Sequence, residues 1–348
     1  MAPRPAPPSA GRRRRRPLGW AVLAAAVVAG VTRPAAQTET TEAPDSLRAA
    51  RPGVSAVVVQ RLQAWPAADF AAGRDSLAAV GLVAAARPDS ARTVSAERLA
   101  LVAVGIAGGA AAIYAWEKSR WWEGGLGPFQ FDDHLDYAAN MDKAAHFYAT
   151  DVQALGATRA LEWAGVRREH AALGGAVAAW LMQLQVEWHD AFYPQWGFDR
   201  YDVAANTLGA GWFYARERLP ALRRFSVRWG YVPRTADPAL WFDEDYQHHT
   251  YWLSARVADL LPERARRLWP EALALSAGVA VADWDPADPH DTGHAELYLS
   301  VDLNYDVLLP RRTLLGRTVA DVLDRFHLPA PAVRLAPEPR FYLLFWGQ

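Results

Sequence analysis

The spacing of hydrophobic positions divides the chain into a helical middle and a strand-rich end. Four apolar segments cover residues 99–116, 135–164, 169–192 and 200–219. Gly165 and Pro194 fall between the later segments and Pro220 follows the last, and both residue types interrupt helices. We therefore predict a bundle of four helices over residues 96–219.

The first of these segments has the length and the flanks of a membrane helix. Residues 99–116 carry no charge, and charged residues with a pair of tryptophans follow, as at a membrane interface. Gly105 and Gly109 form a G-x-x-x-G spacing that lets another helix approach closely. Because 18 residues is near the lower limit for crossing a bilayer, a transmembrane helix and a buried helix of a soluble bundle both fit.

Residues 220–348 are rich in aromatic residues and prolines and carry strand signals. In residues 296–307, apolar side chains at Leu297, Leu299 and every second position after them alternate with polar ones. We predict a strand whose apolar face is buried and whose polar face meets water. Residues 279–282 and 341–345 give weaker strand signals, so we expect antiparallel strands packed on the helices. The predicted fold is mainly α with a β-containing C-terminal part.

Two N-terminal segments precede the helices. Residues 12–16 are all arginine, residues 18–31 are uncharged and apolar, and a Pro-Ala-Ala sequence ends at Ala36. This is the pattern of a secretory signal peptide, so we predict that residues 1–36 are removed after Ala36; an uncleaved anchor is the alternative. Residues 37–95 are rich in Ala, Pro, Ser, Asp and Arg without a sustained period, which predicts a low-complexity linker.

Composition argues against several classes of function. The net charge of −1 offers no bulk attraction to nucleic acid, and the absence of cysteine excludes disulfides, thiolate metal sites and cysteine nucleophiles. We find no common motif of serine hydrolases, zinc proteases or nucleotide-binding loops. Acidic segments with histidines at 243–249 and 283–294 fit solvated loops or turns at least as well as metal sites. We predict no metal site and leave the cofactor open.

Polar side chains stand out on three consecutive predicted helices. The candidate site residues are Asp142, Lys143, His146, Glu187, Asp202 and Asn206. Taken singly, His146 has the ordinary alternative of a core histidine and Asp202 that of a helix cap. On each helix these side chains form a polar stripe along one face. If each stripe were buried separately, each would cost desolvation energy, whereas stripes that face one another can pair. We predict that these residues converge, and that Asp190 and Asp199 are solvated helix-end acids.

Three short motifs resemble a known family. The motifs are MDKAAHF at 141–147, QLQVEWHDAF at 183–192 and FDRYDVAANTLGA at 198–210. Together they resemble the YfiM-like family of predicted periplasmic lipoproteins, a domain of unknown function. They resemble VanZ-like membrane proteins more distantly. The resemblance extends over residues 96–348. It implies a four-helix VanZ-like bundle, localisation in the bacterial cell envelope and a shared polar cluster at the six residues, but no established reaction. The lack of cysteine departs from the lipoprotein pattern.

Two functions compete for this exported, membrane-associated protein. In the first, the six polar residues lock the helices or bind a partner, and the exterior engages a membrane, an envelope lipid or a glycan. In the second, they act on such a molecule by general acid–base chemistry. His146 or Glu187 would then carry the proton and Lys143 would hold an anionic group, while the remaining three residues orient them.

Overall fold

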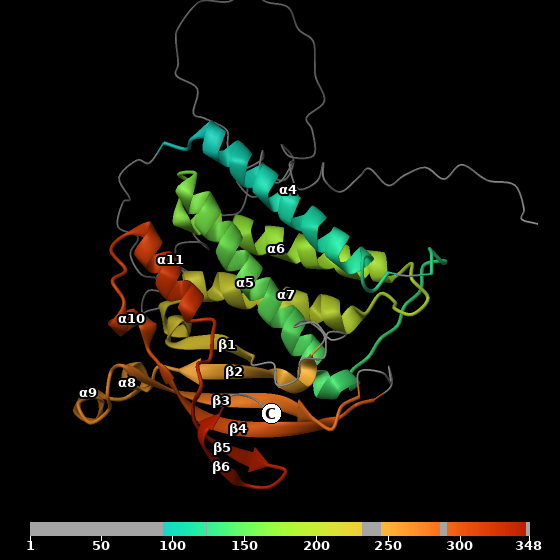
Figure 1. The fold of residues 1–348 in the computed structure, drawn as a ribbon. Coiled ribbons are helices and arrows are strands. Elements are labelled where there is room, and N and C mark those ends of the chain that lie inside the picture. Colours follow the sequence, from blue (N-terminus) through green and yellow to red (C-terminus); the bar gives the residue numbers. More distant parts are fainter. Residues whose placement is uncertain (1–92, 123, 232–244, 286–290, 346–348) are drawn as a thin grey trace, which may run out of the picture.

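The long helices form where the hydrophobic spacing predicts them. The structure is a computed structural model that describes residues 93–122, 124–231, 245–285 and 291–345. The predicted signal peptide lies outside these residues, as does the predicted linker except for its last three positions. The four long helices are α4 (Ala96–Lys118), α5 (Met141–Trp163), α6 (Arg168–Asp190) and α7 (Arg200–Arg218), and they lie side by side in Figure 1.

Helix α5 begins later than the sequence predicts. Residues 135–140 were expected to be helical, but a short 3-10 helix, η1 (Tyr137–Asn140), precedes α5. Ala138, Ala139 and Asn140 have φ values of 47°, 52° and 65°, and residues in the left-handed region cannot continue a right-handed helix. Three such residues in succession therefore set the start of α5 at Met141.

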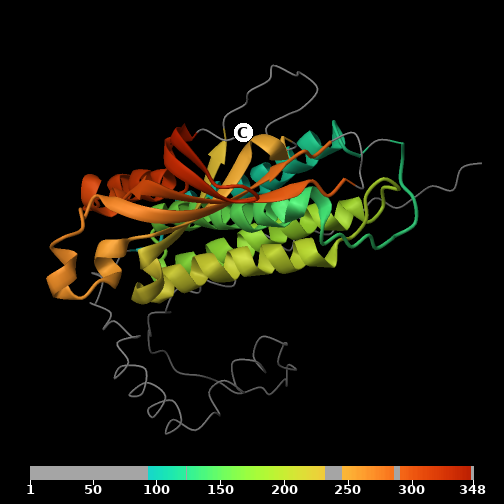
Figure 2. The same ribbon diagram turned by 90° about the horizontal axis from the view of Figure 1, so that it is seen from below.

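The C-terminal part is a single antiparallel sheet with short helices beside it. Six strands pair in chain order: β1 (Phe225–Tyr231), β2 (His249–Ala255), β3 (Leu273–Ala282), β4 (His294–Leu303), β5 (Ala330–Ala336) and β6 (Arg340–Phe345). The short helices are η2 (Pro220–Arg224), η3 (Tyr246–His248), α8 (Val257–Leu260), α9 (Glu263–Arg266), α10 (Tyr305–Leu308) and α11 (Leu314–Leu323). Figures 1 and 2 show this sheet beside the long helices. The mainly helical fold with antiparallel strands at its C-terminal end is thus confirmed.

Strand β4 faces the opposite way from the prediction. Glu296 is 2% exposed and Asp302 is 5% exposed, whereas Leu299 is 48% exposed. The buried face is polar because its charges are paired: Arg334 Nη1 lies 2.6 Å from Glu296 Oε1, and Arg228 Nη1 lies 2.9 Å from Asp302 Oδ1. The prediction that the apolar face is buried was therefore wrong. The strand also ends at Leu303, since the next residues turn into α10.

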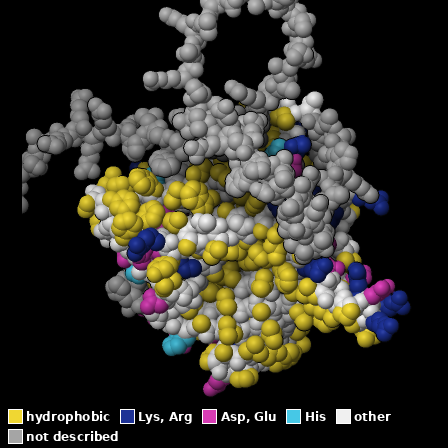
Figure 3. Space-filling view, turned by 180° about the vertical axis from the view of Figure 1, so that it is seen from behind, with side chains coloured by type: hydrophobic (Ala, Val, Ile, Leu, Met, Phe, Trp, Pro, Cys, Tyr) yellow, Lys and Arg dark blue, Asp and Glu magenta, His cyan; other side chains and the backbone are white. Residues whose placement is uncertain are grey.

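The outer face of the sheet is apolar across several strands. Its exposed side chains include Leu253, Leu275, Val279, Leu297, Leu299, Leu303, Val333, Leu335, Phe341 and Leu343. Figure 3 looks at a side of the molecule on which hydrophobic side chains gather over the part that holds the sheet. The inner face thus combines paired charges with the buried aromatic cluster of Trp252, Tyr298 and Phe345, while the exposed face is apolar, unlike the polar exposed face of an ordinary antiparallel sheet in water.

Helix α4 lies on the outside of the other helices and buries little of its surface. Only 6% of its apolar stretch is buried, and it is the one helix in the described part of the chain that is long and apolar enough to cross a membrane. The burial expected of a core helix is therefore not seen among the described residues, and the crossing of a membrane stays a prediction. Gly105 has no neighbour within 4 Å of an added Cβ, and Gly109 meets only a flexible methionine end. Among the described residues, no helix makes the close approach predicted from these glycines.

Two other glycines bring the remaining helices together. A Cβ added to Gly175 of α6 would lie 2.7 Å from the carbonyl oxygen of Ala154 and 2.8 Å from the nitrogen of Thr158, both in α5. A Cβ on Gly209 of α7 would collide with the carbonyl oxygen of Phe147. Backbones can approach this closely only where a side chain is absent, so these positions fix α6 and α7 against α5.

The close approach at Gly175 predicts a specific loss of stability. Gly175→Ala should lower the free energy of unfolding by about 1–3 kcal/mol or more, because the new methyl group meets backbone that cannot rotate away. Gly156→Ala is the matched control, since this glycine lies in α5 with nothing within 4 Å of an added Cβ, and it should gain about 0.5–1 kcal/mol. Urea unfolding measures both. Equal values for the two variants would contradict the packing.

Candidate functional site

The six predicted polar residues meet where α5, α6 and α7 come together. Asp142, Lys143 and His146 lie in the first two turns of α5, Glu187 lies in the last turn of α6, and Asp202 and Asn206 lie in the first turns of α7. The contact at Gly209 contributes to the convergence, because it holds the middle of α7 against the first part of α5. We call these six residues together with Asp199 the polar cluster.

Lys143 is the centre of the charged part of the polar cluster. Its Nζ donates to Asp142 Oδ2 at 2.8 Å, to Asp199 Oδ2 at 2.7 Å and to Asp202 Oδ2 at 3.0 Å. An ammonium group has three N–H donors, and each has an acceptor here. Lys143 therefore positions three carboxylates and has no donor left for an anionic ligand.

His146 lies between the three helices. Its Nδ1 lies 3.2 Å from Asn206 Oδ1 and 3.6 Å from Glu187 Oε1. Its Nε2 lies 3.6 Å from Asp142 Oδ1 and 3.8 Å from Asp202 Oδ1, both longer than a hydrogen bond. The imidazole is therefore surrounded by acceptor atoms, and among the described residues it makes one hydrogen bond, to Asn206.

One side of the polar cluster is open to solvent. The side chains of His146, Asp142 and Lys143 are 18%, 16% and 13% exposed, whereas that of Glu187 is 2% exposed. A ligand can therefore reach the imidazole and the first carboxylate, while Glu187 stays behind them.

The crowded carboxylates differ in their affinity for protons. Burial, strengthened by the charge of Asp202, raises the pKa of Glu187 well above its ordinary value, and burial beside Asp142 raises the pKa of Asp202 to about 7. Burial also opposes ionisation of Asp142, but Lys143 and His146 outweigh it and lower the pKa of Asp142. Burial opposes the charge on His146, yet Asp202 and Asp142 prevail and raise the pKa of the imidazole. The polar cluster thus holds both ionised and protonated acids.

Two members of the site were missed by sequence reasoning. Asp199 is buried. It caps α7 by accepting a hydrogen bond from the N–H of Tyr201 at 2.7 Å, and it accepts a second one from Nζ of Lys143. Its position before a helix was a signal for the cap, but not for burial. Tyr246 of η3 donates its hydroxyl to Asp142 Oδ1 at 3.1 Å across 104 residues of sequence. The local sequence around Tyr246 does not predict such a contact.

Asp190 is also more enclosed than predicted. Trp122 Nε1 donates to its Oδ1 at 2.5 Å, and the Trp122 ring stacks on His189 and Tyr193. Burial raises the pKa of Asp190 to about 7. Both are helix-end acids, as expected. The expectation that they are solvated was wrong for Asp199, which is buried, and Asp190 is partly covered by Trp122.

The two acidic segments weighed as metal sites form local contacts in their described residues. Asp245 pairs with His248 at 2.5 Å, and the His249 ring lies among tyrosines and Trp229. Asp291 accepts the N–H groups of Asp285 at 2.6 Å and of Gly293 at 3.0 Å, as expected of a turn. Residues 243, 244 and 286–290 lie outside the described part of the chain.

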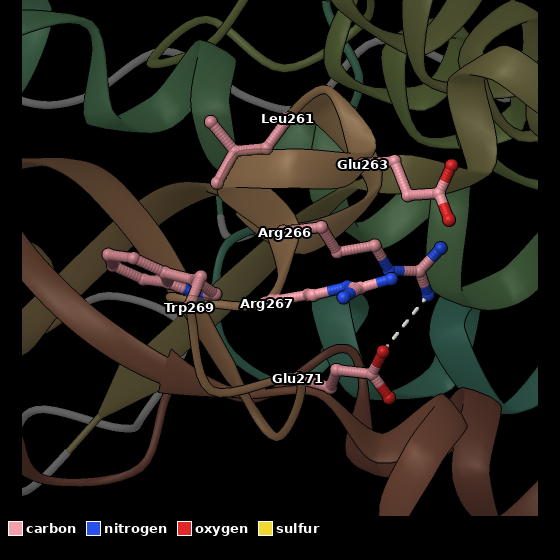
Figure 4. A pocket seen from close by; sticks show the side chains of 6 residues that line it. All are labelled: Leu261, Glu263, Arg266, Arg267, Trp269 and Glu271. Carbon is pink, nitrogen blue, oxygen red and sulfur yellow. Dashed lines mark ion pairs between the residues drawn. The ribbon is translucent and has the colours of Figure 1, made fainter.

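A surface hollow of about 770 Å³ lies at the opposite end of the sheet from the start of α5. Figure 4 shows its lining between α8 and β3, where Arg266 and Glu271 form an ion pair at 3.2 Å. Its charged side chains surround a wide opening and are not enclosed. The polar cluster, not this hollow, concentrates buried ionisable groups and is therefore the candidate site.

Comparison with known proteins agrees with an exported protein of the cell envelope. A family described as a predicted periplasmic lipoprotein (DUF2279) matches residues 131–217, the span that holds α5, α6 and α7. No curated protein and no solved structure matches the chain. The match locates the protein in the periplasm or envelope. The narrower resemblance to YfiM-like and VanZ-like proteins stays a prediction.

The raised pKa of Asp190 predicts a pH-dependent contribution to stability. Its folded pKa of about 7 exceeds the unfolded value of roughly 3.9, so its contribution is present at low pH and is lost as the pH rises through 7. Asp190→Asn should therefore gain stability relative to wild type by about 1–3 kcal/mol between pH 4 and pH 8. Urea unfolding of both proteins at these pH values measures the difference. A difference independent of pH would contradict the assignment.

Proposed function

We propose that the protein acts at a membrane of the cell envelope and that the polar cluster is its chemical site and not a helix lock. The main support for this proposal is that acidic side chains outnumber basic ones in the polar cluster. Four carboxylates, Asp142, Glu187, Asp199 and Asp202, surround one lysine and one imidazole. A group that only locked helices would gain nothing from crowding four acids around two bases.

Other buried ion networks in this protein supply the comparison. Three arginines, Arg216, Arg228 and Arg325, pair with three aspartates, Asp151, Asp302 and Asp324. Burial opposes ionisation of Asp324, but these arginines outweigh it and lower the pKa of this carboxyl. In the polar cluster, by contrast, the pKa values of Glu187 and Asp202 are raised. This network balances three arginines with three aspartates and lowers the pKa of Asp324, which supports a different role for the polar cluster.

The acceptor atoms of the polar cluster restrict the class of ligand. Lys143 is engaged by three carboxylates, so the exposed part of the polar cluster presents mainly acceptor atoms. It favours a cationic group or a neutral hydroxyl or amide over a phosphate. His146 stands at the open side with Glu187 behind it, an arrangement suited to general acid–base chemistry on a polar group of an envelope lipid or glycan.

Matched amide substitutions of two buried acids test this role. Glu187→Gln should leave the free energy of unfolding unchanged or raise it, because it removes an acid that is crowded by like charges. Asp151→Asn, at a fully buried acid paired with Arg325, should lose about 3–5 kcal/mol because an arginine is left buried and unpaired. Urea unfolding in the presence of a chelator gives both values. Losses of equal size would make the polar cluster a helix lock.

Membrane contact is proposed through α4. This helix is apolar on all sides, yet Leu101 and Val104 are 62% and 69% exposed, and a helix that is apolar all round needs a non-aqueous environment. Its 23 residues give a length of about 34 Å, against roughly 30 Å of bilayer hydrocarbon. Lys118, Arg120 and Trp121 follow at one end, as at a membrane interface.

Flotation with vesicles of phosphatidylcholine and phosphatidylglycerol tests the membrane contact. Val104→Glu should weaken vesicle binding on the order of 100-fold, since a charge near the middle of a membrane helix costs about 3 kcal/mol. Leu268→Glu is the control, because Leu268 is 87% exposed between α9 and β3, and it should float like wild type. Leu299→Glu probes the apolar outer face of the sheet. Release by this variant, with none by Val104→Glu, would assign the contact to the sheet instead.

A further inference from the structure

We propose that Asp142, His146 and Asp202 hold a divalent cation of the zinc class. The inference rests on the proposed function in taking the polar cluster to be a chemical site. The Nε2 atom of His146 lies 3.6 Å from Asp142 Oδ1 and 3.8 Å from Asp202 Oδ1, and one ligand atom from each residue lies within 4.8 Å of the others. Ligand atoms about 2.0–2.2 Å from one ion stand roughly 3–4 Å apart, so this spacing suits a shared ion.

The hydrogen bond of His146 orients the imidazole for such a role. Nδ1 faces the amide oxygen of Asn206 at 3.2 Å, and an amide oxygen accepts hydrogen bonds, so Nδ1 carries the proton. The lone pair of Nε2 then points toward two carboxylate oxygens. Metal-binding histidines characteristically donate their other N–H to an oxygen, and a cation would turn the repulsion among these three atoms into attraction.

Asp202 presents a buried carboxylate oxygen to the same place. Its Oδ1 is buried and accepts no hydrogen bond from the described residues, although Lys143 Nζ lies 3.0 Å away. The residue as a whole is 6% exposed, and its nearby cation Lys143 is shared with Asp142 and Asp199. The Oδ1 atoms of Asp142 and Asp202 lie 3.6 and 3.8 Å from His146 Nε2. Oδ1 of Asp142 also accepts the hydroxyl of Tyr246 at 3.1 Å, a contact that would orient it as a ligand.

The donor set and the charge define the class of ion. One imidazole nitrogen and two carboxylate oxygens suit zinc or cobalt better than calcium, which takes six to eight oxygen ligands. Two positive charges would also offset the excess of carboxylates in the polar cluster. Because His146 and Asp142 are partly exposed, the ion would keep positions open toward solvent and could supply Lewis-acid chemistry there.

Titration of the full chain with metal ions tests the proposal. Protein treated with a chelator and returned to chelator-free buffer is titrated with Zn²⁺ by calorimetry and with Co²⁺ by visible absorption. Wild type should bind one ion per chain at the site. His146→Ala and Asp202→Asn should each bind it at least 10-fold more weakly, and Asn206→Ala should lose about 10–100-fold as an outer partner of the histidine. His170→Ala, at an exposed histidine of α6, is the control and should bind like wild type.

The metal titration and the stability measurements can fail independently, so they test the metal site and the proposed chemical role of the polar cluster separately. Circular dichroism first establishes that each variant is folded, and Asp202→Asn, which keeps the shape of the side chain, covers the case in which His146→Ala does not fold. The metal site is overturned if wild type binds no stoichiometric ion. It is also overturned if the folded variants bind the ion as tightly as wild type. Binding of Ca²⁺ but not of Zn²⁺ or Co²⁺ overturns the ion class. The comparison of Glu187→Gln with Asp151→Asn is made in chelator, so it judges the chemical role of the cluster separately.

Discussion

The pairing of buried charges organises this protein. Asp151 of α5 meets Arg325 beyond α11, with Arg325 Nη2 3.3 Å from Asp151 Oδ1, and Asp324 meets Arg228 of β1 at 2.7 Å. Each contact joins segments that lie far apart in the sequence. Because a buried ion without its partner is strongly destabilising, these pairs hold the sheet in one position against the long helices.

The same constraint explains the unusual orientation of the sheet. Once Arg228, Glu296 and Asp302 occupy its inner face, the alternation of a strand directs leucines outward. The exterior is consequently apolar over several strands, and α4 adds a second apolar surface. In water such surfaces are costly, whereas in a membrane-rich envelope they are useful.

The polar cluster is where charge pairing is left incomplete. Lys143 is shared among three aspartates, and Glu187 and Asp202 share the imidazole of His146. The protein balances its charges elsewhere with arginines, so the excess here is a local property of this site. Buried groups with strongly perturbed pKa values concentrate at functional sites, which connects the electrostatics to the proposed chemistry.

The sequence by itself determined the helices, the antiparallel strands and most of the site. Apolar spacing and the interrupting glycines and prolines act within a few residues, so the segments that became α4, α6 and α7 could be read directly. The polar stripes that contain Asp142, Glu187 and Asn206 could be expected to converge, because burying each stripe separately would be costly. Only the tertiary structure decided which face of β4 is buried, since alternation defines two faces but the partners Arg228 and Arg334 select the inner one. It alone brought Tyr246 to Asp142, because a contact across 104 residues depends on how the sheet packs on the helices and leaves no local pattern.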